Sequence, residues 1–241
     1  MPLEKRVITL VKSKKIVLFI VEGITDQISL GLVLSKIIQK DKIVKFKVIH
    51  GDITTDKGTQ SNNIAIKITD KIKDFIGKDV YKKSDIQNVV HLIDTDGVYI
   101  DEALIIQKNI RGVEYDTHHM YARNIENIKE RNEQKTDVLN KLIKTDKVYK
   151  DLPYRIYFFS CNLEHVLHNN EGVLDHDKIK NAQRFEDRFE EEPYGFIEFM
   201  NSPEFAVKGN YTATWDFIKE DTHSLNRYSN FHLYLNVTIH S

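Results

Sequence analysis

The feature that most constrains the fold is a run of six apolar residues that ends directly in an acidic, glycine-containing turn. Residues 16–21 are all apolar and four of them are β-branched, which predicts a strand buried on both faces. Gly23 permits a tight turn after this strand, and Thr25 is placed to cap a helix whose apolar residues recur at helical spacing. A buried strand, a tight turn and an amphipathic helix predict the first unit of a parallel α/β sheet.

The same pattern continues along the first 100 residues. A second strand is expected at Phe46–Ile49, a polar and mobile loop at 52–63, a helix at Ile64–Ile76 and a third strand at Val89–Ile93. Alternating strands and helices over about 80 residues are typical of a parallel sheet flanked by helices, as in Rossmann-like folds.

The second half of the chain is less regular. We expect a helix within 120–150, a fourth strand at Tyr154–Ser160 with a helix after it, and a mainly helical C-terminal part. The predicted organisation is an α/β domain at 1–170 with a helical C-terminal subdomain at 171–241 packed on it, separated by a soft boundary.

Two of the predicted strands end in carboxylates. Glu22 follows the first strand and Asp26 lies one helical turn later, so that it can point back to the same edge. Asp94 and Asp96 follow the third strand, where alternation along an extended segment would place both on one side. Ligands of parallel α/β sheets bind beyond the carboxyl ends of the strands.

Carboxylates crowded at one edge repel each other unless a cation lies among them. Oxygen ligands without sulfur favour Mg²⁺ or Mn²⁺. Such ions can orient a water molecule and stabilise the leaving oxygen of a phosphodiester. The residues therefore predict a metal site for phosphodiester chemistry.

These motifs resemble a Toprim domain. Val21-Glu22-Gly23-x-Thr25-Asp26 followed by an apolar strand and Asp94-x-Asp96 is similar to the metal-binding fold shared by topoisomerases, bacterial primases and overcoming-lysogenization-defect nucleases, and the first motif is closest to the last type. The resemblance covers residues 14–165. It implies that Glu22 is the general acid/base or a first-metal ligand, that Asp26 is a ligand of a second metal, and that Asp94 and Asp96 hold the metals.

A second resemblance lies after the fourth strand. Small Toprim-like defence nucleases carry a glutamate at the start of the helix that follows a late strand, which implies that Glu164 is a further metal ligand. Lys208 and Arg227 are candidate substrate-binding cations on the basis of charge alone. The chain has no Gly-x-x-x-x-Gly-Lys phosphate loop, which leaves two alternatives open: a stand-alone nuclease, or the effector of a separately encoded ATPase partner.

Composition limits the partners. Lys and Arg number 35 and Asp and Glu 36, a formal net charge of −1, so contacts with nucleic acid must come from local clusters of lysine and arginine. The single cysteine, Cys161, excludes an intramolecular disulfide and a cysteine-based zinc site. The longest purely apolar run, Ile16–Val21, is too short to span a membrane, and a cytoplasmic location without membrane contact is expected.

The expected function is a Mg²⁺- or Mn²⁺-dependent nuclease that cleaves DNA or RNA, with Glu22 and Asp94 as catalytic residues. The resemblance to defence nucleases implies a role against phage or mobile DNA. Two other classes stay open: a nucleotide phosphohydrolase or phosphotransferase that uses the same acids, and a non-catalytic module that binds a partner. The sequence also leaves a homo-oligomer open.

Overall fold

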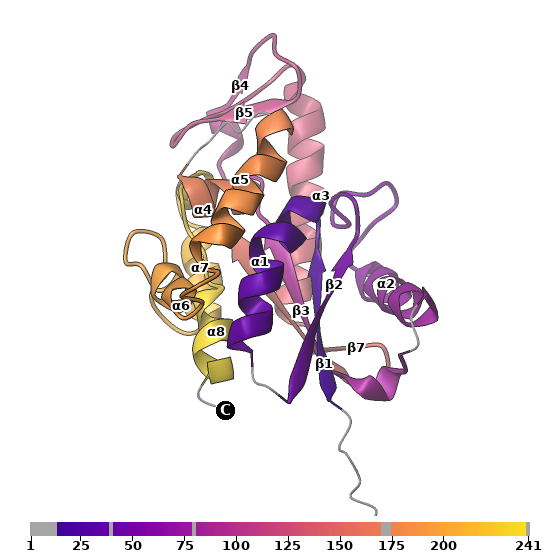
Figure 1. The fold of residues 1–241 in the computed structure, drawn as a ribbon. Coiled ribbons are helices and arrows are strands. Elements are labelled where there is room, and N and C mark those ends of the chain that lie inside the picture. The colour runs from indigo at the N-terminus through magenta and orange to yellow at the C-terminus, as the bar shows by residue number, and fades with distance from the viewer. Residues whose placement is uncertain (1–13, 39–40, 79–80, 170–174, 240–241) are drawn as a thin grey trace, which may run out of the picture.

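The fold is organised around a central five-stranded sheet (Figure 1). The computed structural model describes residues 14–38, 41–78, 81–169 and 175–239. The strand order is β2-β1-β3-β8-β7, in which the first four strands are parallel and β7 is antiparallel to β8. The strands are β1 (Lys15–Val21), β2 (Lys42–Val48), β3 (Ile86–Asp94), β7 (Lys147–Val148) and β8 (Leu152–Phe159). The predicted α/β class with a mostly parallel sheet is confirmed.

Helices cover both faces of this sheet. Apolar side chains of α2 (Ile64–Lys78), α3 (Ile125–Ile143) and α7 (Tyr211–Ile218) pack on one face. The other face is covered by α1 (Ile24–Ile37), α4 (Leu163–His168), α5 (Asp175–Arg188), α6 (Gly195–Met200) and α8 (His232–Ile239). Each strand of the sheet interior therefore has two buried faces, which explains why β1 reads as an uninterrupted apolar run. None of the helices in the described part of the chain is long and apolar enough to span a membrane.

A second, three-stranded sheet stands above the carboxyl edge of the central one (Figure 1). It consists of β4 (Ile105–Gln107), β5 (Val113–Tyr115) and β6 (Met120–Ala122) in the order β4-β6-β5. We call residues 105–122 the arm. Short 3₁₀ turns lie at Lys83–Asp85, Glu102–Leu104 and His223–Leu225. The base of the arm packs on its own small apolar cluster, which includes Met120 and Leu225.

The C-terminal part is joined to the end of β8 by hydrogen bonds. Ser160 donates its backbone N–H to the carbonyl of Tyr228 at 2.8 Å, and Phe158 donates to Asn230 Oδ1 at 2.9 Å. After residue 174 the named elements are all helical, and they contribute to both faces of the sheet. The predicted boundary at residue 170 lies outside the described residues.

Two local predictions are wrong. Thr25 does not cap α1, because the backbone N–H of Gly23 is bound by Asp26 Oδ2 at 2.9 Å and Thr25 lies inside the first turn. The segment from Asp94 to Asp96 is not extended, because Asp96 has a φ of 49°. The first difference arises from a local contact across the first turn of α1, whereas Asp96 contacts Lys135 and Cys161, which are distant in sequence. Both lie at the carboxyl edge of the sheet.

The loop at 52–63 was expected to be polar and mobile, and the structure shows how its start is held. Asp52 Oδ1 accepts hydrogen bonds from the backbone and hydroxyl of Thr54, and Gln134 of α3 donates to the Thr54 carbonyl at 3.0 Å. Ile53 and Thr54 are buried. The loop is therefore anchored to α3 at the end that lies beside the first strand.

Candidate active site at the carboxyl edge of the sheet

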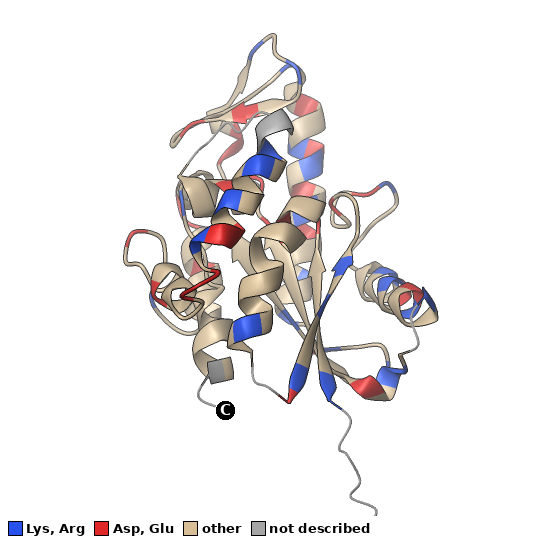
Figure 2. Cartoon of the chain, viewed as in Figure 1, with Lys and Arg blue, Asp and Glu red and all other residues tan. Residues whose placement is uncertain are grey.

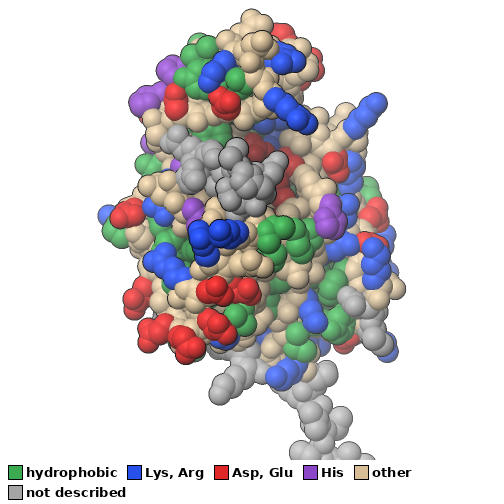
Figure 3. All heavy atoms as spheres, turned by 45° about the horizontal axis from the view of Figure 1, so that its top comes forward, with side chains coloured by type: hydrophobic (Ala, Val, Ile, Leu, Met, Phe, Trp, Pro, Cys, Tyr) green, Lys and Arg blue, Asp and Glu red, His purple; other side chains and the backbone are tan. Residues whose placement is uncertain are grey.

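The ends of three adjacent strands bring carboxylates together. Glu22 follows β1, Asp52 follows β2, and Asp94 ends β3. The backbone N–H of Gly51 donates to the carbonyl of Glu22 at 3.1 Å, and the backbone N–H of Asp94 lies 3.3 Å from Glu22 Oε1. Acidic side chains are visible in a hollow between the arm and the body of the protein (Figure 3). We use the name acidic rim for Glu22, Asp26, Asp52, Asp94, Asp96 and Glu164.

The helix α4 adds Glu164 from the fourth parallel strand. Asp94 Oδ1 accepts the backbone N–H of Leu163 at 3.0 Å, so the start of α4 is held against the end of β3. Thr25 Oγ1 lies 3.3 Å from Glu164 Oε1, which joins the start of α1 to that of α4. The predicted candidates Glu22, Asp26, Asp94 and Glu164 are thus brought together from the ends of β1, β3 and β8.

A buried lysine lies among these acids. Lys135 of α3 has a side chain with 0% exposure, and its Nζ lies 2.8 Å from Asp52 Oδ2 and 2.6 Å from Asp96 Oδ2. Asp96 is held further by Arg131, which donates to its carbonyl at 3.1 Å. Asp94 and Asp96 therefore have different partners: Asp94 contacts α4 on one face of the sheet, and Asp96 contacts α3 on the other.

Burial and mutual repulsion change the acidity of the rim. Burial raises the pKa of Glu22 well above its ordinary value, although Lys135 opposes the change. Burial and then the charge of Glu22 raise the pKa of Asp94. Burial raises the pKa of Asp26 to about 7. Burial acts in the same direction on Asp52, but Lys135 and Thr54 outweigh it and lower the pKa of that carboxyl group.

Lys135 stays charged in this position. Burial alone would lower the pKa of its ammonium group, but Asp96, Glu22 and Asp52 raise it above its ordinary value. The rim therefore combines a permanent cation on the α3 side with three buried carboxyl groups, those of Glu22, Asp26 and Asp94, whose raised pKa disfavours ionisation.

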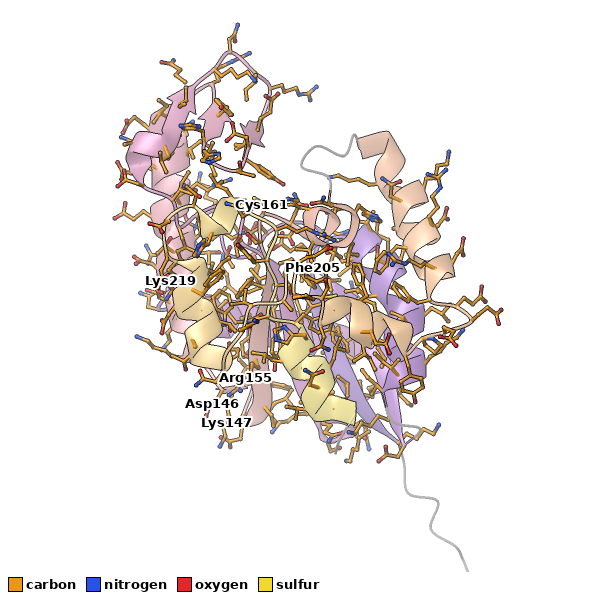
Figure 4. The ribbon with its side chains drawn as sticks, turned by 90° about the vertical axis from the view of Figure 1, so that its left-hand side faces the viewer. Asp146, Lys147, Arg155, Cys161, Phe205 and Lys219 are labelled. Atoms are coloured by element: carbon orange, nitrogen blue, oxygen red, sulfur yellow. The ribbon has the colours of Figure 1, made fainter. Side chains whose placement is uncertain are left out.

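Unusual backbone conformations accompany the rim. His50, Asp96 and Cys161 have φ values of 57°, 49° and 53° and lie just beyond β2, β3 and β8. Non-glycine residues in this region cost on the order of 1–3 kcal/mol each and cluster at functional sites. Asp96 and Cys161 are also joined, because the backbone N–H of Asp96 donates to the Cys161 carbonyl at 2.9 Å. Cys161 lies at the upper end of the sheet in Figure 4, whereas Asp146 and Arg155 lie toward the opposite end.

The two predicted substrate-binding cations lie in different settings. Arg227 is 16% exposed in its side chain, donates to the carbonyl of Val166 at 2.9 Å, and pairs with Glu204 at 3.2 Å. It ties α4 to the C-terminal part, so its guanidinium group already has protein partners. Lys208 is exposed on the segment that precedes α7. Their role as substrate-binding residues stays a prediction.

The donor set of the rim suits a hard divalent cation, but the side chains are not yet turned toward one. Within residues 14–38, 41–78, 81–169 and 175–239, no group of three or more His, Cys, Asp or Glu side chains is arranged to hold a metal ion as it stands. Asp26 Oδ2 accepts the backbone N–H of Gly23, Asp94 Oδ1 accepts the backbone N–H of Leu163, and Asp96 Oδ2 is bound by Lys135. Burial and the neighbouring carboxylates raise the pKa of Glu22, Asp26 and Asp94, so a cation would relieve the repulsion among these oxygen donors after side-chain rotation.

Two residues of the site were missed at the level of the sequence. Asp52 comes four residues after β2, beyond a turn at His50 and Gly51, so it does not read as a strand end. Lys135 lies within the helix expected at 120–150, to which no site residue was assigned. It lies seven residues after Ile128 and seven before Leu142, which are both buried. A lysine on the apolar stripe of a helix needs a buried acidic partner, and this signal could have found it.

Comparisons of this chain with protein-family models, with curated proteins and with solved structures found no match. The function is therefore argued from the site itself.

Proposed function

We propose that this protein is a Mg²⁺- or Mn²⁺-dependent nuclease whose active site is the acidic rim. The observation that carries the proposal is the gathering of Glu22, Asp94 and Glu164 at one edge of a parallel sheet, at the ends of three adjacent strands. This edge is where α/β sheets bind their ligands. An oxygen-only set of acids suits phosphodiester chemistry assisted by a divalent cation.

A Toprim-like fold is the form of this α/β architecture that we favour. Its support is the order of the motifs on the elements: a Glu-Gly turn directly after β1, and Asp-x-Asp after β3, its neighbour in the sheet. The glutamate at the start of α4 extends the same edge. We propose by the same resemblance that the nuclease acts in defence against phage.

Within the site, Glu22 is the proton-handling group. It interacts electrostatically with Lys135, Asp52, Asp96 and Asp26, so it occupies the centre of the rim. Its raised pKa allows the carboxyl group to hold a proton at higher pH than an exposed glutamate does.

Glu22, Asp26, Asp94 and Glu164 would hold the metal, which when bound supplies positive charge and Lewis acidity next to the phosphodiester. The chain turns directly after Asp94, where Asp96 and Gly97 have left-handed φ values of 49° and 67°.

Nucleic acid would approach beneath the arm. Lys108, Arg111 and Arg123 lie on or beside the arm strands, and Arg111 and Arg123 are exposed. Lysine and arginine residues also occur on α5, which packs next to α1 (Figure 2). With a net charge of −1, binding depends on these local cations and falls steeply with salt.

The test is cleavage of plasmid DNA and of tRNA, side by side, in Mg²⁺ and in Mn²⁺. Asp94→Asn keeps an oxygen that can accept the Leu163 N–H but removes one charge, and it should reduce cleavage by orders of magnitude. Asp146→Asn is the matched control, because Asp146 is an exposed aspartate at the opposite end of the sheet (Figure 4). Cleavage in excess chelator, or equal activity of the two variants, contradicts the proposal. Hydrolysis of mononucleotides without polymer cleavage favours a phosphohydrolase instead.

A further inference from the structure

The arm contacts the body of the protein at the start of α4, beside the acidic rim (Figure 1). Tyr115, the last residue of β5, reaches from the arm to Asn162, whose side-chain Nδ2 donates to the Tyr115 hydroxyl at 3.0 Å. We propose that Tyr115 is a positioning residue, which holds the first turn of α4, and with it Glu164, at the rim. This inference rests on the proposed function, and it gives the arm a part in catalysis as well as in substrate binding.

Asn162 is the residue through which Tyr115 acts on α4. Its Oδ1 accepts the backbone N–H of His165 at 2.8 Å and so caps the helix, while its Nδ2 is the group that binds Tyr115. The oxygen and nitrogen of an asparagine side chain belong to one planar amide, so a hydrogen bond at Nδ2 also sets the direction of Oδ1. Tyr115 therefore orients the cap of α4.

The first turn of α4 makes two contacts with the rim. The backbone N–H of Leu163 donates to Asp94 Oδ1 at 3.0 Å, and Glu164 Oε1 lies 3.3 Å from Thr25 Oγ1. Leu163 and Glu164 directly follow Asn162 in the chain, so a change in the orientation of the cap moves both of them. Displacements of about 1 Å in an active site can reduce its rate by about 100-fold.

Tyr115 approaches α4 from a part of the arm that is held in place by other contacts. It pairs with Met120 of β6, which is fully buried at the base of the arm. The turn after β5 is bound to the body as well, because Asn226 Nδ2 donates to the carbonyl of Thr117 at 3.1 Å. The rings of Tyr115 and His165 also pack together, with centroids 5.9 Å apart. Removal of the hydroxyl should therefore leave the arm folded.

The Tyr115 hydroxyl is suited to hydrogen bonding rather than to nucleophilic attack. Burial raises its pKa above the ordinary value, and Cys161 and Asp94 act in the same direction, although the hydrogen bond from Asn162 opposes them. The phenol therefore stays protonated near neutral pH. The influence of Asp94 also shows that this hydroxyl of the arm lies close to the rim.

Tyr115→Phe and Tyr121→Phe form a matched pair, because each removes one hydroxyl from a tyrosine of the arm. The Tyr121 hydroxyl donates to Asp116 within the arm at 2.7 Å. For cleavage of the favoured substrate, Tyr115→Phe should lower kcat by about 10-fold to 100-fold with KM nearly unchanged, and Tyr121→Phe should change neither. Asn162→Ser keeps a capping oxygen but lacks the amide that binds Tyr115. It should reproduce the loss, and its combination with Tyr115→Phe should lower kcat by no more than about a further twofold.

Hydrogen exchange of the metal-free proteins provides a readout that does not depend on activity. The backbone amides of residues 163–168 should exchange about fivefold faster in Tyr115→Phe and Asn162→Ser than in the wild-type protein or Tyr121→Phe. A folded Tyr115→Phe protein that keeps the wild-type kcat, or whose α4 amides exchange at the wild-type rate, would overturn the inference and leave the proposed nuclease intact. A wild-type protein that cleaves neither DNA nor RNA would overturn the proposed function, and the exchange rates would still decide whether Tyr115 positions α4.

Discussion

Replacement of Lys135 by methionine should be among the most damaging single changes in this protein. Methionine retains the length of the side chain but leaves Asp52 and Asp96, which are 13% and 34% exposed, without their cation. Loss of one partner from a buried ion pair costs about 3–5 kcal/mol. In a domain of this size that corresponds to a drop in melting temperature of about 6–20 °C. Since total stabilities are about 5–15 kcal/mol, we expect a folded but weakened protein.

Thermal melts in chelator measure this loss, and two further variants isolate its cause. Lys129→Met changes a lysine of the same helix that pairs with Glu102 and Glu126 near the surface, and it should have a much smaller effect. Combination of Lys135→Met with Asp52→Asn and Asp96→Asn should recover most of the stability, because neutral groups no longer repel each other. If Lys135→Met lowers the melting temperature no more than Lys129→Met does, the buried ion pairs are not important for the fold.

Three other predictions test different parts of the account. Burial lowers the pKa of His91 to about 3 in the folded protein. In the unfolded chain the same imidazole binds a proton below about pH 6.5, so the folded state loses stability as the pH falls from 6.5 toward 3. At pH 5 the loss is about 2 kcal/mol, and acid titrations of His91→Gln should lack it. Gly97→Ala places a Cβ 2.6 Å from Leu225 Cδ2 at a φ of 67°. Urea denaturation should show that the free energy of unfolding falls by about 1 kcal/mol or more. The control Gly77→Ala, whose Cβ meets no atom within 4 Å, should gain stability. Arg111→Ala should reduce the salt slope of DNA binding, measured by anisotropy, by about 0.9; an unchanged slope would remove the arm from the interface.

Much of the central fold follows from local sequence patterns. The apolar run before Glu22 forms β1, and the spacing of Ile64, Ile68 and Ile72 gives the buried face of α2. These predictions succeed because a strand with two covered faces and an amphipathic helix each have a distinct periodicity. The clustering of Glu22 and Asp94 was predictable for the same reason, since parallel neighbouring strands end at the same edge.

Other parts depend on contacts between distant residues. The arm is built from strands of three residues, which are too short for a periodic signal. Lys135 meets Asp52 and Asp96 only because α3 packs beside the ends of β2 and β3, 83 and 39 residues away in sequence. Such pairings come from tertiary packing, which single-sequence patterns do not encode.

The most direct test of the central claim is Mn²⁺-dependent cleavage of plasmid DNA and tRNA by Glu22→Gln. Glutamine keeps the oxygen that lies near the backbone N–H of Asp94 but cannot bind or transfer a proton as a carboxylate does. We expect cleavage of the favoured substrate to fall by about 100-fold or more. The metal-free variant should melt at the same temperature as the wild-type protein or higher, because one charge that burial disfavours is gone. A folded Glu22→Gln protein that cleaves at the wild-type rate would contradict the assignment of the acidic rim as the active site.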